Sequence, residues 1–294
     1  MNQSNSSLAM ILLLVLSIIW GSAYWFIKHA LKVFDPFELG MLRMTMAALA
    51  LLPLALKDLR KLKREDLPFL FLVGLFGNFL PAVLFPLAQQ KISSAEAGVL
   101  NSLSPLFIIL VSFLVYKKRY PWVNVAGVLV GMIGAVILIV GGADGNLDFN
   151  GKAGYALFVV MATICYAISA NVAKHHFVSY PPARLTSFAI CFFGIPSVLY
   201  VLLGTDIPAD VTLKPDGWKA LGIVALLGSV MSGVAVIMFY KMLQVSSLVY
   251  ASMVTFTAPI VVALLAVIDH ETIGLAHIIG MAVILAGVFL VNRK

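Results

Sequence analysis

Long apolar segments recur along the whole chain, and they restrict its fold more than any other sequence feature. Ten of them are separated by charged residues or by Pro and Gly. They cover residues 8–31, 36–56, 67–88, 94–116, 121–141, 153–177, 182–203, 217–240, 247–268 and 272–292. Each is long enough to cross about 30 Å of hydrocarbon as an α-helix. We therefore expect ten transmembrane helices.

Composition supports a membrane protein and excludes two other classes. Hydrophobic residues make up 62% of the 294 residues, and charged residues make up 11%. A soluble domain needs roughly twice this share of charged residues, and a disordered chain needs far lower hydrophobicity. Lipid offers no partner to backbone groups, and the runs are continuously apolar rather than alternating as in barrel strands. The expected fold class is an all-α, polytopic membrane protein.

The distribution of basic residues predicts the orientation of the chain in the membrane. With both termini in the cytoplasm, the inner loops hold twelve of the 20 Lys and Arg residues, and the outer side holds six. The inner excess is concentrated at 57–64 and 117–119. Cytoplasmic loops of membrane proteins carry such an excess. The net charge of +7 is therefore assigned to cytoplasmic loops, and we expect no nucleic acid as a partner.

The two halves of the chain resemble each other in sequence. An offset of 146 aligns Trp20 with Tyr166, and it aligns Lys28, His29 and Pro36 with residues of the same type. An offset of 154 aligns Ser93, Ala97 and Pro105 with Ser247, Ala251 and Pro259. We therefore expect two five-helix repeats, residues 1–145 and 146–294. Because five is odd, the repeats would be inverted, as in many secondary transporters.

Several ordered motifs resemble those of a known family. They are Trp20-Gly21-Ser22, Arg43, the segment AEAGVLNSLSP from Ala95 to Pro105, ASMVTFTAP from Ala251 to Pro259, and GMAVILAGVFLV from Gly280. Together they make the chain similar to the EamA-type branch of the drug/metabolite transporter superfamily. The resemblance implies ten helices, two inverted repeats, a central cavity and alternating access. It also implies export of amino-acid-like metabolites or drugs.

No motif of catalysis or of cofactor binding is present in the sequence. It lacks a GxxxxGK[ST] nucleotide-binding loop and an HExxH metal motif, and Cys165 and Cys191 are too few for a disulfide framework. We expect no catalytic residue, no metal and no cofactor, and we do not expect an enzyme. A membrane-embedded enzyme acting on lipids is one alternative, and a non-transporting scaffold is another.

Three acidic or basic residues within the spans are candidates for a functional role. Arg43 lies about seven residues into the second span, where it could receive a carboxylate or phosphate. It could instead pair with Glu38 or Glu96, or extend outward to the interface. Glu38 and Glu96 are candidates for proton coupling, although each also has the spacing of a residue that caps a helix.

Six uncharged residues complete the predicted substrate site. Asn78, Asn101 and Thr255 lie deep in their spans, where they could bind a solute or form hydrogen bonds between helices. Trp20 is too deep for an interfacial aromatic belt, and it could line a cavity with its repeat-mate Tyr166 and with Tyr24.

The composition of these candidates suits a small amphipathic or zwitterionic solute. The family resemblance implies the direction of transport, so the expected protein is an exporter in the cell inner membrane, with a small-molecule substrate and the lipid bilayer as its partners. We expect a monomer, with a homodimer as the alternative.

Overall fold

The computed structural model describes residues 3–142, 153–203, 205–268 and 275–292. Within these ranges the chain forms helices and no strands. The helices of the first half are α1 (Gln3–Ala30), α2 (Pro36–Asp58), α3 (Leu67–Gly74), the π-helix η3 (Leu75–Phe79), α4 (Leu80–Gln89), α5 (Ser94–Asn101), α6 (Ser104–Tyr116) and α7 (Trp122–Gly142). The all-α prediction is confirmed for the described part of the chain.

The second half has a corresponding series of helices. They are α8 (Ala153–His176), α9 (Pro182–Leu203), the short α10 (Ile207–Leu213), α11 (Gly217–Leu226), the π-helix η4 (Leu227–Val234), α12 (Ala235–Val245), α13 (Leu248–Ser252), α14 (Val254–Ile268) and α15 (Leu275–Asn292). Helices therefore lie at each of the ten predicted apolar segments. The predicted boundary between the repeats, at residues 145 and 146, lies outside the described residues.

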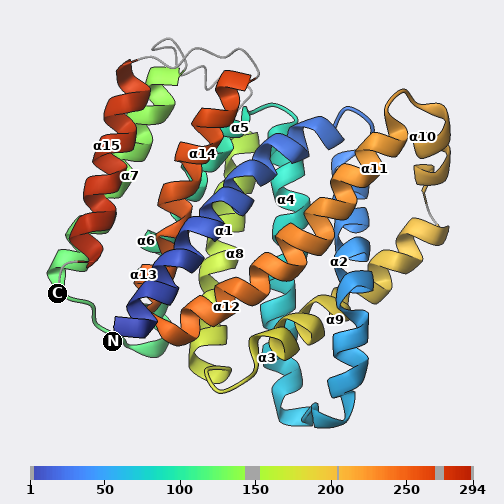
Figure 1. Cartoon of the computed structure of the whole chain (residues 1–294), viewed down its shortest axis with the longest axis horizontal. Coiled ribbons are helices and arrows are strands. Elements are labelled where there is room, and N and C mark those ends of the chain that lie inside the picture. Colours follow the sequence, from blue (N-terminus) through green and yellow to red (C-terminus); the bar gives the residue numbers. More distant parts are fainter. Residues whose placement is uncertain (1–2, 143–152, 204, 269–274, 293–294) are drawn as a thin grey trace.

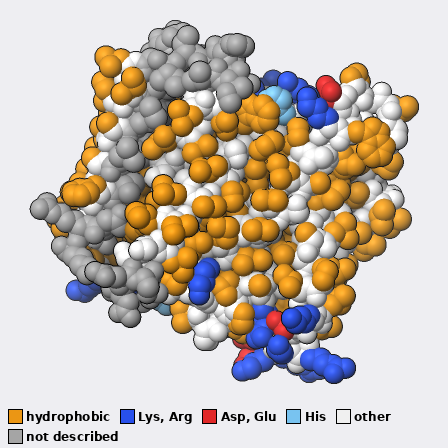
Figure 2. Space-filling model, in the orientation of Figure 1, with side chains coloured by type: hydrophobic (Ala, Val, Ile, Leu, Met, Phe, Trp, Pro, Cys, Tyr) orange, Lys and Arg blue, Asp and Glu red, His pale blue; other side chains and the backbone are white. Residues whose placement is uncertain are grey.

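Seven helical segments of the described chain are long and apolar enough to cross a membrane. They are 6–30, 36–61, 64–89, 154–176, 182–203, 217–245 and 248–265. Shorter apolar helices cover 104–116 and 122–134. Figure 2 shows a broad hydrophobic surface on one face of the molecule. It also shows basic side chains gathered at the lower end, where α2 connects to α3 in the same view in Figure 1. The chain is a multi-pass membrane protein.

The fourth and ninth predicted segments are each broken into two helices. The first break is the turn at residues 102–103 between α5 and α6, and the second is at Met253 between α13 and α14. The sequence analysis treated both segments as continuous spans. Pro105 lies in the first turn of α6 and Pro259 lies inside α14, and a proline cannot donate a backbone hydrogen bond to the residue four positions earlier. Both breaks lie beside the central space of the molecule.

Helices of the two halves cross and pack against each other. α2 packs along α9, α1 packs on α14 and α12, and α4 packs on α8. α7 and α15 lie side by side at one edge of the molecule (Figure 1). Because neighbouring helices come from different halves, both halves surround the space between them.

Two glycines mark the same helix contact in the two halves. A Cβ atom on Gly228 of η4 would lie 2.5 Å from the carbonyl oxygen of Arg43 in α2. A Cβ atom on Gly74 of α3 would collide with the carbonyl oxygen of Ala189 in α9. The offset of 154 relates the two glycines, and the offset of 146 relates Arg43 to Ala189. The backbone arrangement around these contacts therefore recurs in both halves.

Candidate functional site

A central cavity lies between helices of both halves. It contains about 960 Å³ of space not filled by protein atoms, a volume that includes open solvent at its mouth. The seven predicted substrate-binding residues all line it: Trp20, Tyr24, Arg43, Asn78, Asn101, Tyr166 and Thr255. The structure thus brings together residues from α1, α2, η3, α5, α8 and α14. Their role in binding a substrate stays a prediction.

Two equivalent pairs lie among the aromatic rings that line the cavity. The ring centroids of Trp20 and Phe239 are 5.3 Å apart, and those of Tyr166 and Phe85 are 6.0 Å apart. The repeat offsets of 146 and 154 relate the first pair to the second, since Trp20 aligns with Tyr166 and Phe85 aligns with Phe239. The aromatic wall of one half therefore has a counterpart in the other.

The indole of Trp20 has a structural hydrogen bond in addition to its place in the wall. Its Nε1–H donates to the backbone carbonyl of Met231 at 3.0 Å. That carbonyl belongs to the π-helix η4, in which the regular α-helical hydrogen-bond ladder is interrupted. The bond holds the ring in a fixed orientation, so the indole offers its apolar face to the cavity.

Two prolines and two serines shape the broken helices beside the cavity. Pro105 leaves the carbonyl of Asn101 without its helical donor, and the Ser104 hydroxyl donates to that carbonyl at 2.7 Å. Pro259 does the same to the carbonyl of Thr255, and the Ser102 hydroxyl donates to it at 2.9 Å. These bonds satisfy the freed carbonyls and so stabilise both breaks.

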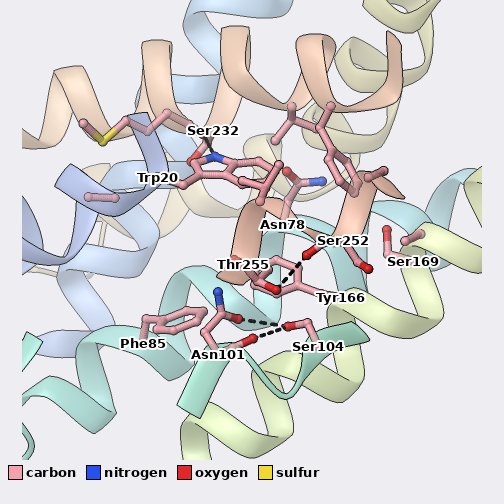
Figure 3. A pocket seen from close by; sticks show the side chains of 18 of the residues that line it. Trp20, Asn78, Phe85, Asn101, Ser104, Tyr166, Ser169, Ser232, Ser252 and Thr255 are labelled. Atoms are coloured by element: carbon pink, nitrogen blue, oxygen red, sulfur yellow. Dashed lines mark hydrogen bonds between the residues drawn. The ribbon is translucent and has the colours of Figure 1, made fainter. Parts of the chain in front are cut away.

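The amide of Asn101 and the hydroxyl of Thr255 belong to these breaks. The Oδ1 of Asn101 accepts a bond from Ser104 at 3.1 Å, and its amide nitrogen lies on the opposite side of the group from Ser104 in Figure 3. The Thr255 hydroxyl donates to the carbonyl of Ser252 at 2.8 Å. The threonine hydroxyl is therefore partly engaged within the protein.

The two π-helices each supply one polar residue to the cavity. Asn78 lies in η3 and Ser232 lies in η4, and both line the cavity (Figure 3). The Asn78 side chain is 6% exposed, and its Nδ2 makes no hydrogen bond of normal geometry among the described residues, although the Tyr240 hydroxyl lies close enough to interact with the amide. The Ser232 hydroxyl donates to the carbonyl of Leu227 at 3.1 Å. A buried amide donor without a partner is costly unless a bound molecule or water satisfies it.

Arg43 forms a contact that none of its predicted alternatives included. Its side chain is 9% exposed, and its Nε donates to the Ser232 hydroxyl at 2.8 Å. In the part of the chain that the structure describes, it has no ion pair with Glu38, Glu96 or any other carboxylate. Nor does it extend outward to the interface, because it lines the central cavity.

Glu38 and Glu96 lie at helix starts and do not line the cavity. The backbone N–H of Ser93 donates to Glu96 Oε2 at 2.6 Å, and the N–H of Glu96 donates to Ser93 Oγ at 3.1 Å. The predicted capping box is thus confirmed. Glu38 Oε2 accepts a longer bond of 3.4 Å from the N–H of Asp35. No Asp or Glu is among the described residues of the cavity lining.

Several lining residues were not singled out in the sequence. They are Phe85, Ser169, Ser232, Phe239 and Tyr240. The repeat offset would have identified two of them, because Asn78 aligns with Ser232 and Phe85 aligns with Phe239 at an offset of 154. Ser169 and Tyr240 have no comparable signal in the sequence.

Polar contacts join the two halves of the chain near the helix ends at both ends of the molecule. The Tyr180 hydroxyl donates to Asp66 at 2.7 Å, and Arg184 pairs with Asp58 at 3.0 Å. Burial, together with the bond to Asp66, raises the pKa of Tyr180 to about 12, so its hydroxyl keeps its proton at neutral pH. Elsewhere, Lys214 donates to the Val33 carbonyl at 2.8 Å. Each contact joins a residue of the first half to one of the second, at or beside the ends of helices.

The described residues contain no cluster of three or more His, Cys, Asp or Glu side chains that could hold a metal ion. Both cysteines are free thiols, and Cys165 is buried. The polar chemistry of the cavity therefore comes from one guanidinium, two amides and several hydroxyl groups. Such groups can bind and orient a solute.

Comparison with known proteins identifies the family. The profile of the EamA-like transporter family matches residues 7–140 and 153–293. An uncharacterised transporter of Archaeoglobus fulgidus is 27% identical over 94% of this chain and 95% of its own length. The uncharacterised inner membrane transporter YedA of Escherichia coli (strain K12) is 26% identical over 95% of this chain and 89% of its own length.

Two further matches extend this comparison. A probable terminal-alkyne amino-acid exporter of Streptantibioticus cattleyicolor is 24% identical over 96% of this chain and 92% of its own length. A solved crystal structure superposes with a TM-score of 0.71 and 21% sequence identity, and the match covers 97% of this chain and 96% of that chain. That likeness shows a shared fold. With its apolar helices and its family profile, the chain belongs to the EamA-like transporter family and is a membrane transporter.

Proposed function

We propose that this protein is a secondary exporter of small amphipathic or zwitterionic metabolites, amino-acid-like compounds or drugs. The observation that carries the proposal is the central cavity, whose walls combine six aromatic side chains with one guanidinium, two amides and several hydroxyl groups. Equivalent residues from both halves line it, so a movement of one half against the other would change access to the same space. The printed name of the Streptantibioticus cattleyicolor relative supports an amino-acid-like solute.

The proposed architecture is ten spans in two inverted repeats, 1–145 and 146–294. Three recurring features support it: the two glycine contacts, the two aromatic pairs and the two proline breaks with their serine donors. The two segments that match the family profile divide the chain at a similar place.

The proposed location is the cell inner membrane, with both termini in the cytoplasm. The name of the YedA relative and the basic residues at 57–64 and 117–119 support this orientation. Single cysteines at Lys61 and Asp210 test it in a background with Cys165 and Cys191 replaced by alanine. An impermeant thiol reagent applied to intact cells is expected to label the variant at 210 and not the variant at 61. Labelling of both, or the reverse pattern, would contradict the topology.

Transport by purified protein in proteoliposomes tests the proposed function. We expect uptake or release of amino-acid-like solutes, and we expect Trp20→Ala, Asn101→Ala and Tyr166→Ala each to reduce it. Loss of an aromatic wall removes about 1–3 kcal/mol of solute contact, or about 5- to 150-fold in affinity. Leu14→Ala changes the 55%-exposed outer side of the same helix as Trp20 and serves as the control. Wild-type transport by all three cavity variants would place the site elsewhere.

The placement of Glu38 and Glu96 favours a facilitated or exchange mechanism over coupling to protons through the protein. Both carboxylates cap helices, and neither faces the cavity. We therefore expect Glu96→Gln to retain transport. A proton current that accompanies the solute in liposomes and disappears in Glu96→Gln would refute this mechanism.

A further inference from the structure

Among the described residues, the cavity lining carries a positive charge and no negative charge. Arg43 is the cation of this lining, and no Asp or Glu accompanies it. Its side chain is 9% exposed, and the bond from Nε to Ser232 leaves its two terminal nitrogens without a hydrogen-bond partner among the described residues, so they are available to the cavity. A buried guanidinium is costly when no anion compensates it. Its planar fork of donors fits the two oxygens of a carboxylate.

A second unsatisfied donor lies on the other π-helix. The Nδ2 of Asn78 is buried at the cavity and makes no hydrogen bond of normal geometry among the described residues. A carbonyl, ether or ring-nitrogen acceptor on a bound solute would satisfy it. Arg43 and Asn78 lie on different helices, α2 and η3, so the two donors can engage different parts of one molecule.

The same lining offers little to a free ammonium group. An ammonium needs a carboxylate or several converging acceptors to replace its water. Three acceptors here each already accept a hydrogen bond from the protein: Oδ1 of Asn101 from Ser104, the carbonyl of Thr255 from Ser102, and the carbonyl of Met231 from Trp20. A positively charged group would also be repelled by Arg43.

From these observations we infer that the cavity selects small amphipathic monoanions: solutes with one carboxylate at Arg43, a hydrogen-bond acceptor at Asn78, an aromatic or aliphatic body, and no free ammonium. This inference rests on the proposed function, keeps its amphipathic solutes and removes the zwitterions from its substrate class. Ser232 is then a positioning residue, because it holds the guanidinium through Nε and leaves the fork free.

A set of four compounds built on one scaffold tests the inference. N-acetylphenylalanine carries a carboxylate and no ammonium, phenylalanine carries both, phenylalaninamide carries only the ammonium, and N-acetylphenylalaninamide carries neither. Isothermal calorimetry on the purified protein measures binding independently of transport. We expect N-acetylphenylalanine to bind at least 10-fold tighter than each of the other three, with phenylalaninamide the weakest.

Substitutions test whether the Arg43 side chain causes this preference. Arg43→Gln is expected to reduce the preference for N-acetylphenylalanine over N-acetylphenylalaninamide to within about 2-fold, and Arg43→Lys to retain part of it. Arg184→Gln makes the same change at an ion pair outside the cavity lining and is expected to leave the preference intact. Should Arg43→Gln not fold as a monodisperse protein, Ser232→Ala replaces it and is expected to lower the preference at least 3-fold.

The outcomes separate this inference from the proposed function. Equal or tighter binding of phenylalanine than of N-acetylphenylalanine would overturn the inference, as would an unchanged preference in Arg43→Gln. Transport of the four compounds without a preference for the monoanion would overturn the inference and leave the proposed exporter standing. If none of the four is bound or transported, both fail for this class of solute.

Discussion

The two π-helices, η3 and η4, have closely similar backbone surroundings and different side chains. In the second half, Gly228 lets η4 approach the carbonyl of Arg43 in α2, and Ser232 accepts a hydrogen bond from the Arg43 side chain. In the first half, Gly74 lets α3 approach the carbonyl of Ala189 in α9. The residue that corresponds to Ser232 is Asn78, whose Nδ2 makes no hydrogen bond of normal geometry among the described residues.

The difference between the two regions comes from residue identity at one related pair of positions. Ala189 of α9 occupies the position that corresponds to Arg43 of α2. Ser232 therefore has an arginine at this related position, and Asn78 has an alanine. The repeated backbone can therefore build a nearly symmetric cavity, while the side chains give it one charged side and one neutral side. Such a cavity can orient a solute that has two different ends.

The largest effect is expected from filling the space between the packed backbones. Gly228→Ala would place a Cβ atom 2.5 Å from the carbonyl oxygen of Arg43 and 2.9 Å from the backbone nitrogen of Ala47. Both are backbone atoms, so relief requires α2 and η4 to move apart. We expect a loss of about 3 kcal/mol in the free energy of unfolding, measured by thermal unfolding in detergent.

Gly74→Ala is a second test of the same kind. A Cβ atom there would collide with the carbonyl oxygen of Ala189, so we expect a similar loss in the free energy of unfolding. Gly222→Ala is the matched control: a Cβ atom there meets nothing within 4 Å, and alanine favours a helix over glycine. A melting temperature of Gly228→Ala that equals the wild type would contradict the close packing of η4 on α2.

A smaller effect is expected from releasing the Arg43 side chain. Ser232→Ala removes the acceptor of the Nε bond and keeps the cation in the cavity. The bond to Ser232 contributes about 1.5 kcal/mol to holding the guanidinium in place, so its loss is expected to weaken binding of a monocarboxylate by roughly 3- to 10-fold. Titration calorimetry measures it. Ser169→Ala, which removes a hydroxyl of the cavity wall contributed by α8, is expected to have a smaller effect and serves as the comparison.

The smallest effect is expected on the neutral side. Asn78→Leu removes the unpartnered donor and keeps a side chain of similar size. A neutral hydrogen bond contributes about 1 kcal/mol, or about 5-fold in affinity. We expect this loss for N-acetylphenylalanine and not for 3-phenylpropanoate, which lacks the acetyl acceptor. Equal losses for both compounds would show that Asn78 does not bind the acetyl group.

The sequence predicts the helices and the cavity residues well, for physical reasons that are local. A long apolar run must be helical in lipid, and a side chain with a polar group deep in such a run is best placed facing the protein interior. These rules suffice to select Trp20, Asn101 and Tyr166. The spacing of Ser93 and Glu96 likewise predicts their capping box, which the structure confirms.

The contacts between distant helices could not be read in the same way. The bond from Arg43 to Ser232 joins residues 189 positions apart, and the bond from Trp20 to Met231 depends on a carbonyl exposed by a π-helix. Neither a hydropathy pattern nor a local motif reports where such a backbone group lies. The π-helices η3 and η4 also have no periodicity that distinguishes them from α-helix over so few residues.

The pairing of α7 with α15 has a consequence for how the protein is made. A Cβ atom on Gly287 of α15 would lie 2.6 Å from the backbone nitrogen of Gly131 and 2.7 Å from the carbonyl oxygen of Gly127 in α7. During synthesis α7 enters the membrane more than a hundred residues before its partner is translated. Until α15 is made, the glycine surface of α7 therefore has no second-half helix packed on it, and the edge of the molecule is completed only by the last helix of the chain.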